Sequence, residues 1–375
     1  MESFYYEPCK GRADGSTAGE ETLARFFLIL LYELWKIIRL QSTKYPQRAI
    51  IRLVSTVSIP VRVDNHPHIR PLNVLRDLSA VADLIELCFS PTMDHDGQRY
   101  LSDMRRASRD DSFLRWASRV TETATLPLVG YVWEENGQII GNASLIPFRH
   151  KGQRIFLIAN VAAHPDYRRR GIGRALTERV MKQARDRRAS AIWLHVRDDN
   201  PGAIRLYEQL GFQEISRRTT WQAGPDSRLT DPETDIKILP RHPQFWPQQQ
   251  EWLQRAYPDD LKWYHAWNLN AFRPGLLNWM YLLLIDSNIK QWAAVRNDKL
   301  LGTLTWMPQG GRSESLYAAL GTGSDPYALT ALLIQVRRLV TYYPYLTLEY
   351  PAGEMTEAIN AAGFKPRRTL LWMRA

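Results

Sequence analysis

One segment, residues 160–176, limits most strongly how this chain can fold. Its sequence is Asn-Val-Ala-Ala-His-Pro-Asp-Tyr-Arg-Arg-Arg-Gly-Ile-Gly-Arg-Ala-Leu. We expect a strand over 154–162, a turn at Pro165, and an arginine-rich loop that opens a helix over 173–187. Backbone N–H groups at a helix N-terminus have no intrahelical partner and attract negative charge, and Gly171 and Gly173 allow a ligand close to the backbone. The segment therefore predicts a phosphate or pyrophosphate site.

Two familiar nucleotide-binding loops do not fit this segment. A P-loop needs Gly-Lys-Ser/Thr, whereas Gly173 is followed by Arg174 and Ala175. A dinucleotide fingerprint needs a third glycine where the chain has Leu176, and a first glycine directly after a strand. What remains is the pattern Arg/Gln-x-x-Gly-x-Gly/Ala, which the chain presents as Arg168 to Gly173.

A second motif follows at a fixed separation. Residues 193–212 contain Asn200-x-x-Ala203-x-x-x-Tyr207-x-x-x-Gly211-Phe212, after a strand expected over 191–196 and on a helix expected over 201–210. The loop and this motif together resemble the GNAT superfamily, the Gcn5-related N-acetyltransferases. The resemblance is tight over about 155–222, looser over 68–150 and degenerate over 290–375.

The resemblance implies acetyl-CoA (coenzyme A) as the acyl donor and assigns roles to individual residues. The backbone of three residues would pair with the pantetheine arm as an added strand does: Val161, Ala162 and Ala163. The pyrophosphate would be held by Arg168, Arg169, Arg170, Gly171, Ile172, Gly173 and Arg174. Asn200 and Ala203 would contact the cofactor, and Tyr207 would protonate the departing thiolate. Two structural interpretations remain open: Asn200 as a plain helix N-cap, and Tyr207 as a core residue.

The acceptor amine must lose a proton, and His195 is the candidate base. Residues 193–212 are especially similar to bacterial ribosomal-protein alanine N-acetyltransferases, in which a glutamate lies twelve residues before the tyrosine. The chain has His195 there, and an imidazole with an unperturbed pKa of about 6.5 suits a base at neutral pH. The alternative is that His195 is only a polar residue of the strand and that the proton leaves through a chain of water molecules.

The remaining pattern predicts a mixed α/β (α+β) fold of mostly antiparallel strands flanked by helices. Strands are expected at 68–72, 128–133 and 139–147, with a last one beginning at 219–222, and helices at 77–89 and 96–108. Residues 297–308 match 136–147 without a gap, and Gly363-Phe364 echoes Gly211-Phe212. These similarities predict a tandem duplication.

The second copy lacks the chemistry of the first. Residues 320–326 contain no arginine but hold Asp325, and the positions of Tyr207 and Asn200 are taken by Ile359 and Ala352. We therefore expect one active site per chain. The predicted organisation is an extension with an amphipathic helix over 22–40 (1–66), a catalytic domain (67–235) and a degenerate GNAT-like domain (236–375).

The composition of the chain limits which classes of partner and cofactor are expected. The net charge of +10 concentrates beside the glycine loop, where a polyanionic cofactor accounts for it, so a nucleic-acid partner is not favoured. The two cysteines form no ligand or disulfide pattern, so no metal site is expected. With no transmembrane segment and no secretory signal apparent, we expect a cytoplasmic protein; the oligomeric state is left open.

The predicted function is acetyl transfer from acetyl-CoA to a primary amine, on a small molecule or a protein N-terminus, by direct attack. Three alternatives remain: a non-catalytic acyl-CoA-binding sensor, an enzyme similar to mycothiol synthase that acetylates a small thiol-containing amine, and a nucleic-acid-associated protein whose arginines contact phosphates. The mycothiol synthase family keeps its working site in the C-terminal half, the reverse of this chain.

Overall fold

The computed structural model of the chain describes residues 66–90, 93, 95–109, 129–226, 228–230, 232–264, 269–284, 289–308, 313–323 and 325–375. These residues belong to one compact unit that runs from His66 to Ala375. The predicted helix over 22–40 and nearly all of the N-terminal extension lie outside the described residues. None of the helices in the described ranges combines the length and the apolar character needed to span a bilayer.

The first half alternates strands and helices in the order that the sequence predicts. Its elements are β1 (Ile69–Pro71), α2 (Val74–Phe89), α3 (His95–Ala107), β2 (Gly130–Glu135), β3 (Gln138–His150), β4 (Gln153–Ala163), α5 (Ile172–Asp186), β5 (Ala191–Arg197), α6 (Pro201–Gln209) and β6 (Gln213–Ala223). The prediction for β6 was wrong at its start, because the strand begins six residues before residue 219. Its early residues pair with β12, from Gln213↔Arg374 onward.

The second half repeats this order. Its elements are β7 (Lys237–Pro240), α7 (Trp246–Ala256), α8 (Leu276–Leu284), β8 (Lys290–Arg296), β9 (Lys299–Met307), β10 (Ser313–Leu320), α9 (Pro326–Leu339), β11 (Tyr345–Pro351), α10 (Thr356–Ala361) and β12 (Lys365–Arg374).

The two halves also share local detail. The hairpins β2–β3 and β8–β9 both turn through two residues with positive φ, Asn136-Gly137 and Asn297-Asp298. Both carry a register shift at the same place, after the pairs Trp133↔Gly141 and Ala294↔Gly302. Such agreement in turn and bulge supports the hypothesis of a tandem duplication.

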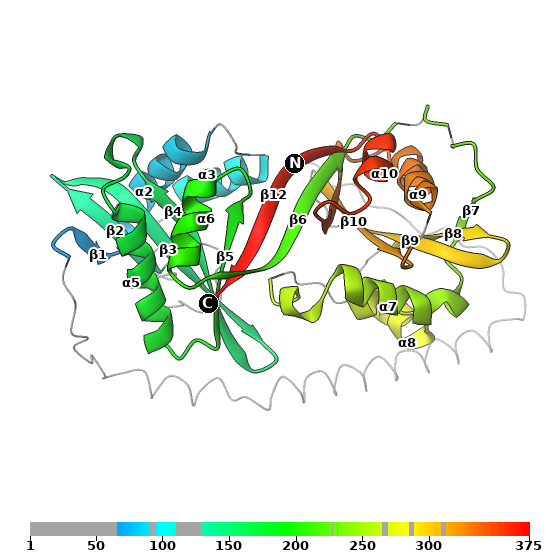
Figure 1. Cartoon of the computed structure of the whole chain (residues 1–375), viewed down its shortest axis with the longest axis horizontal. Coiled ribbons are helices and arrows are strands. Elements are labelled where there is room, and N and C mark those ends of the chain that lie inside the picture. The colour runs from blue at the N-terminus through cyan, green and yellow to red at the C-terminus, as the bar shows by residue number, and fades with distance from the viewer. Residues whose placement is uncertain are drawn as a thin grey trace, which may run out of the picture. The chain divides into compact units, whose positions relative to one another are not determined.

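The halves exchange their last strands. The twelve strands in the described part of the chain form one sheet in the order β1-β2-β3-β4-β5-β12-β6-β11-β10-β9-β8-β7. Figure 1 shows β6 and β12 running side by side between the two halves. The last strand of the first half therefore lies next to β11, and the last strand of the second half lies next to β5.

Side chains follow the exchange. Leu371 and Met373 of β12 are buried in the core of the first half, and Trp221 of β6 is buried in the core of the second. The buried guanidinium of Arg218 on β6 pairs with Glu349 of β11 at 2.7 Å and also donates to the carbonyl of Ala256. Each half is thus completed by a strand from the other, whereas the predicted boundary at residue 235 follows only the order of elements along the chain.

Candidate active site

An opening between β4 and β5 is the central feature of the first half. The two strands pair in parallel only from Ile155↔Ala191 to Ile158↔Leu194. Beyond these pairs β4 continues to Ala163 and β5 to Arg197, both fully described, with no further pairing between them. Backbone groups along this edge make no strand pairs between β4 and β5 and can therefore bind a ligand that adds as a strand does, although the carbonyl of Ala163 already accepts from the Cys88 thiol at 3.3 Å.

A β-bulge explains why the strands diverge here. Asn142 pairs with Ala162 and Ser144 with Ala159, so Asn160 and the next residue together oppose a single residue of β3. Asn160 has a positive φ of 53°. The backbone carbonyl of Asn160 accepts a hydrogen bond from the Asn142 side chain at 2.9 Å. The side-chain amide of Asn160 donates to the Tyr100 hydroxyl at 2.8 Å. Because a bulge bends its strand, β4 turns away from β5 just after the last parallel pair. The predicted pantetheine-binding residues, Val161, Ala162 and Ala163, lie on the diverging part.

The predicted pyrophosphate loop follows directly. A 3-10 turn (Pro165–Tyr167) leads into exposed arginines, and α5 begins at Ile172. Gly171 precedes the helix with a left-handed φ of 80°, and no side chain caps the first turn. The free N–H groups of this turn carry the positive end of the helix dipole, which suits a phosphate.

Arg170 and Arg174 of the loop both contact other side chains of the protein. Arg170 pairs with Glu135 at 3.1 Å and lies over the ring of Tyr167. Arg174 donates to Gln209 at 2.5 Å and pairs with Glu178 at 3.4 Å. All of these arginines are exposed, and surface ion pairs are worth at most about 1 kcal/mol. A bound polyanion can therefore displace these contacts at little cost.

Gly173 gives a clean test of the loop. A Cβ added there meets only the side chain of Leu206, at an ordinary 3.7 Å, so the fold itself does not require glycine. We expect Gly173→Val to weaken coenzyme A binding by about tenfold or more while the melting temperature shifts far less, because the side chain occupies the space in front of free N–H groups. Isothermal titration calorimetry measures the affinity. The control is Gly224→Val, just after β6, where an added Cβ also meets a single atom at an ordinary distance, the carbonyl oxygen of Pro344 at 3.6 Å. Equal affinity in both variants would place the cofactor elsewhere.

The motif on α6 faces the same core as α5. Asn200 caps α6 by accepting from the N–H of Ala203 at 3.1 Å, so its structural role is observed and its cofactor contact stays a proposal. Tyr207 is 7% exposed and packs in the cluster that holds Leu194 and Val196 of β5. Burial raises the pKa of Tyr207 to about 12. The phenol therefore keeps its proton at neutral pH, as a general acid must.

His195 lies on the opposite face of β5. Side chains alternate along a strand, and Trp193 packs in a different cluster from Leu194. The His195 ring contacts Trp372 at 4.0 Å and Tyr264 at 4.7 Å between centroids. His195 is also the first β5 residue beyond the parallel pairs. The candidate acid and the candidate base thus flank the opening from opposite faces of the sheet.

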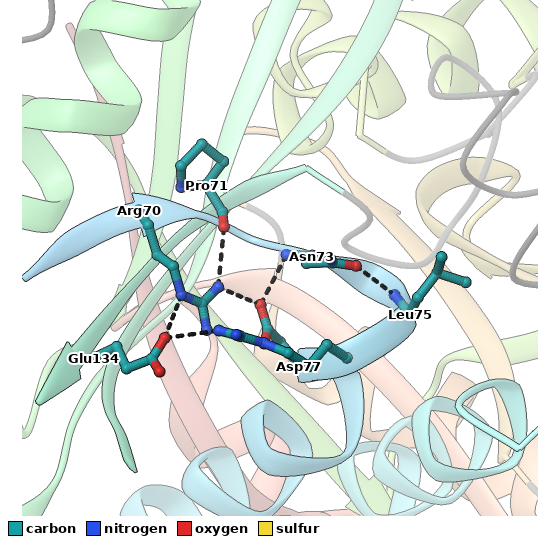
Figure 2. Close-up of polar contacts among 7 residues, drawn as sticks. Arg70, Pro71, Asn73, Leu75, Asp77 and Glu134 are labelled. Atoms are coloured by element: carbon teal, nitrogen blue, oxygen red, sulfur yellow. Dashed lines mark hydrogen bonds and ion pairs between the residues drawn. The ribbon is translucent and has the colours of Figure 1, made fainter. Parts of the chain in front are cut away.

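The glutamates of the β2–β3 hairpin have other partners. Figure 2 shows Glu134 held by Arg70, which also binds the buried carboxylate of Asp77. The hydrogen bond from Arg70 is the main cause of a lowered pKa of Glu134. Glu135 has a lowered pKa chiefly because of Arg170. Both carboxylates are ion-paired with arginines at the hairpin, so neither is a second candidate base beside His195. No three His, Cys, Asp or Glu side chains gather as a metal site anywhere in the described ranges.

The matching opening in the second half is filled. Strands β10 and β11 pair in parallel only from Ser313↔Tyr345 to Leu316↔Leu348. Immediately beyond, the N–H of Ala318 donates to the hydroxyl of Tyr257 at 3.2 Å, and that hydroxyl donates to the carbonyl of Glu349 at 3.4 Å. Tyr257 follows α7 and is 1% exposed. A side chain therefore satisfies the backbone groups that remain open in the first half.

The helix that follows β10 is capped as well. The Asp325 carboxylate accepts from the N–H of Tyr327 at 2.9 Å, at the start of α9, and pairs with Arg296 at 2.7 Å. A carboxylate thus occupies the place where α5 leaves its N–H groups free. The sequence predicted the loss of the loop, but Tyr257 was missed, because its role depends on a contact between segments far apart in the chain.

These contacts sharpen the expectation of a single site. Titration with coenzyme A should saturate at one equivalent per chain, because Tyr257 and Asp325 occupy the second copy. Native mass spectrometry or calorimetry gives the stoichiometry. A value of two would show that the second opening is accessible despite Tyr257.

Comparison with known proteins identifies the fold and a family model that matches part of the chain. The structure resembles the crystal structure of a GCN5-related N-acetyltransferase from Sphaerobacter thermophilus, with a TM-score of 0.51 and 17% identity over 82% of this chain and 96% of that chain. The fold is therefore that of the GCN5-related N-acetyltransferases. Residues 84–212 match the model of the Acetyltransferase (GNAT) family. The match covers the segment from within α2 to just past α6, which is about a third of the chain.

Two curated sequence relatives each match part of the chain. The [Ribosomal protein bS18]-alanine N-acetyltransferase of Escherichia coli (strain K12) is 44% identical over 69 residues, which are 18% of this chain and 47% of that protein. The mycothiol acetyltransferase of Corynebacterium kroppenstedtii is 30% identical over 141 residues, which are 33% of this chain and 35% of that protein. The chain thus spans less than half the length of each of these relatives.

Proposed function

We propose that the chain transfers an acetyl group from acetyl-CoA to a primary amine at a single site in its first half. The observation that carries the proposal is the opening between β4 and β5, which ends at the uncapped N-terminus of α5 and is flanked by Tyr207. The family match and the names of the relatives support acetyl transfer. The acceptor is proposed only as a primary amine.

The proposed role of each residue follows from where it lies around the opening. The open edge of β4 pairs with the pantetheine arm, and the start of α5 with its arginines holds the pyrophosphate. Acetyl-CoA, when bound, supplies an activated acetyl group as a thioester. The amine approaches from the face of His195, which accepts its proton. Tyr207, on the other face, donates a proton to the departing sulfur, so the two proton transfers occur on opposite sides of the sheet.

Release of free thiol tests this function. Acetyl-CoA is mixed with a panel of primary amines and of peptides with free N-termini, and coenzyme A thiol is followed spectrophotometrically. Amine-dependent release is the expected result, and the Gly173→Val variant should release less thiol than wild type when acetyl-CoA is below saturation. Tight binding of acetyl-CoA without release by any acceptor would instead favour a non-catalytic acyl-CoA sensor.

The role of His195 is tested by pH. An imidazole base makes the rate rise through its pKa, whose unperturbed value is about 6.5. We expect His195→Gln to lose this rising limb and to fall in kcat by about 10²-fold. The control is His242→Gln, whose ring contacts Phe245 far along the chain. If the limb persists in His195→Gln, the proton leaves through water and His195 is only part of the strand.

A further inference from the structure

The bulge in β4 is held by side chains from two directions. Its residue Asn160 has a left-handed φ of 53°, a conformation that residues other than glycine adopt at a cost in free energy. From β3, the buried side chain of Asn142 donates to the backbone carbonyl of Asn160. From α3, the hydroxyl of Tyr100 accepts from the side-chain amide of Asn160 at 2.8 Å. The bulge residue is therefore tethered once through its backbone and once through its side chain.

The position of Tyr100 is fixed independently of the bulge. Its ring packs against the core cluster that joins α2 and α3 to Val132 of β2. Trp133, the next residue of β2, belongs instead to the cluster that contains Tyr207. Because neighbouring side chains of a strand point to opposite faces, Tyr100 lies on the face of the sheet opposite Tyr207, where His195 also lies. The packing of α3 thus sets where the tyrosine hydroxyl meets β4.

The described part of the second half has no such arrangement. Strand β10 pairs with β9 one residue for one over Ser315–Leu320, so this stretch contains no bulge. In the aligned repeats Thr303 stands in the place of Asn142. At the position that corresponds to the bulge, Ala318 donates through its N–H to the hydroxyl of Tyr257. The bulge and its tethers therefore accompany the opening that is free to bind a ligand, and the regular strand accompanies the opening that is filled.

We propose that Tyr100 is a positioning residue for the acyl donor, because its hydroxyl holds Asn160 in the left-handed conformation and so keeps the edge of β4 in the shape that binds acetyl-CoA. Without the hydroxyl, Asn160 relaxes part of the time toward the ordinary β conformation. The affinity for the donor then falls by the fraction of molecules that have lost the bulge, since only the competent conformer binds. This inference rests on the proposed function and deepens it by adding a residue of α3 that acts on the donor site through Asn160.

Calorimetric titration of the full-length chain with coenzyme A tests the tether. Tyr100→Phe keeps the ring and removes the hydroxyl, so the dissociation constant should rise about threefold to tenfold, the effect of one hydrogen bond. Asn160→Ala loses the same bond and tolerates positive φ less well than asparagine does, so its rise should be about tenfold or more. Asn160→Gly adopts positive φ readily and should stay within about threefold of wild type. The control, Tyr350→Phe, alters a buried tyrosine of the second half and should match wild type.

A double variant separates the tether from the packing of α3. Glycine at position 160 makes the tyrosine hydroxyl unnecessary, so Tyr100→Phe should cause no further rise in the Asn160→Gly background. A loss that came from disturbed packing of α3 would appear in both backgrounds. In addition, saturating acetyl-CoA restores the bulge by binding to it, so kcat of Tyr100→Phe should stay within about twofold of wild type while KM for acetyl-CoA rises.

The outcomes distinguish this inference from the proposed function. Unchanged affinity in Tyr100→Phe, or an equal rise in the wild-type and Asn160→Gly backgrounds, overturns the role of Tyr100 and leaves the donor site in place. A fall in kcat without a rise in KM also overturns it, because a tether of this kind acts on donor binding. A wild-type chain that does not bind coenzyme A overturns the proposed function and this inference together.

Discussion

Tyr207→Phe should lower kcat for acetyl transfer by about 10²-fold or more and leave the affinity for acetyl-CoA nearly unchanged. The substitution removes the proton that the departing thiolate receives, and general acids contribute about 10² to 10⁴ in rate. The ring remains, so the packing against Leu194 and Val196 is kept. Steady-state kinetics with a saturating amine gives kcat, and calorimetry gives the affinity.

A second buried tyrosine serves as the matched control. Tyr350 of β11 is 4% exposed, and burial is the main cause of its pKa of about 12, as for Tyr207. Tyr350→Phe should therefore show the effect of losing a buried hydroxyl away from the opening, with kcat near that of wild type. Full activity of Tyr207→Phe would mean that the thiolate departs without a proton from this residue.

Neither half should fold as a monomer when produced alone. A fragment of residues 1–224 lacks Leu371, Trp372 and Met373, each at most 1% exposed in the whole chain. Burying a large apolar side chain contributes about 1.5–3 kcal/mol, so the loss approaches the total stability of a typical domain, about 5–15 kcal/mol. Far-UV circular dichroism and size-exclusion chromatography should show an unfolded or aggregated fragment.

The control keeps both halves but cuts the connection. A protease site inserted at the exposed Arg228 allows the purified chain to be nicked between β6 and β7. The nicked chain should stay folded and elute as one species, since the exchanged strands hold it together. A monomeric 1–224 fragment that unfolds cooperatively would show that β12 is dispensable for the first core.

The sequence was sufficient for the parts that local chemistry determines. The arginine–glycine loop, the Asn200 cap and both hairpins follow from turn and helix-end preferences, and the structure has them where predicted. The face on which His195 lies was not predictable, because β5 reads Ala-Ile-Trp-Leu-His-Val-Arg. Because most side chains of β5 are apolar on both faces of the strand, no polar–apolar alternation shows which face points to the core.

The strand exchange was beyond prediction for a different reason. Strands β6 and β12 come from equivalent places in the two repeats, so each carries a pattern compatible with either neighbour. Which edge a strand joins is decided by the whole sheet rather than by its own residues. Tyr257 was missed for a related reason, since its hydroxyl bonds to Ala318 and Glu349, which both lie more than 50 residues away in sequence.

The exchanged strands also bear on how such a chain evolves. On the hypothesis of a tandem duplication, deleting the second repeat from the gene would remove β12 from the core beside β5. Selection for activity in the first repeat would then maintain the second, although Tyr257 fills the opening between β10 and β11 and Asp325 caps the start of α9. Substitutions in β12, such as at Leu371 or Met373, can then alter the core of the first repeat without touching the loop proposed to hold the donor, so the second copy offers a route by which the properties of the first site can change.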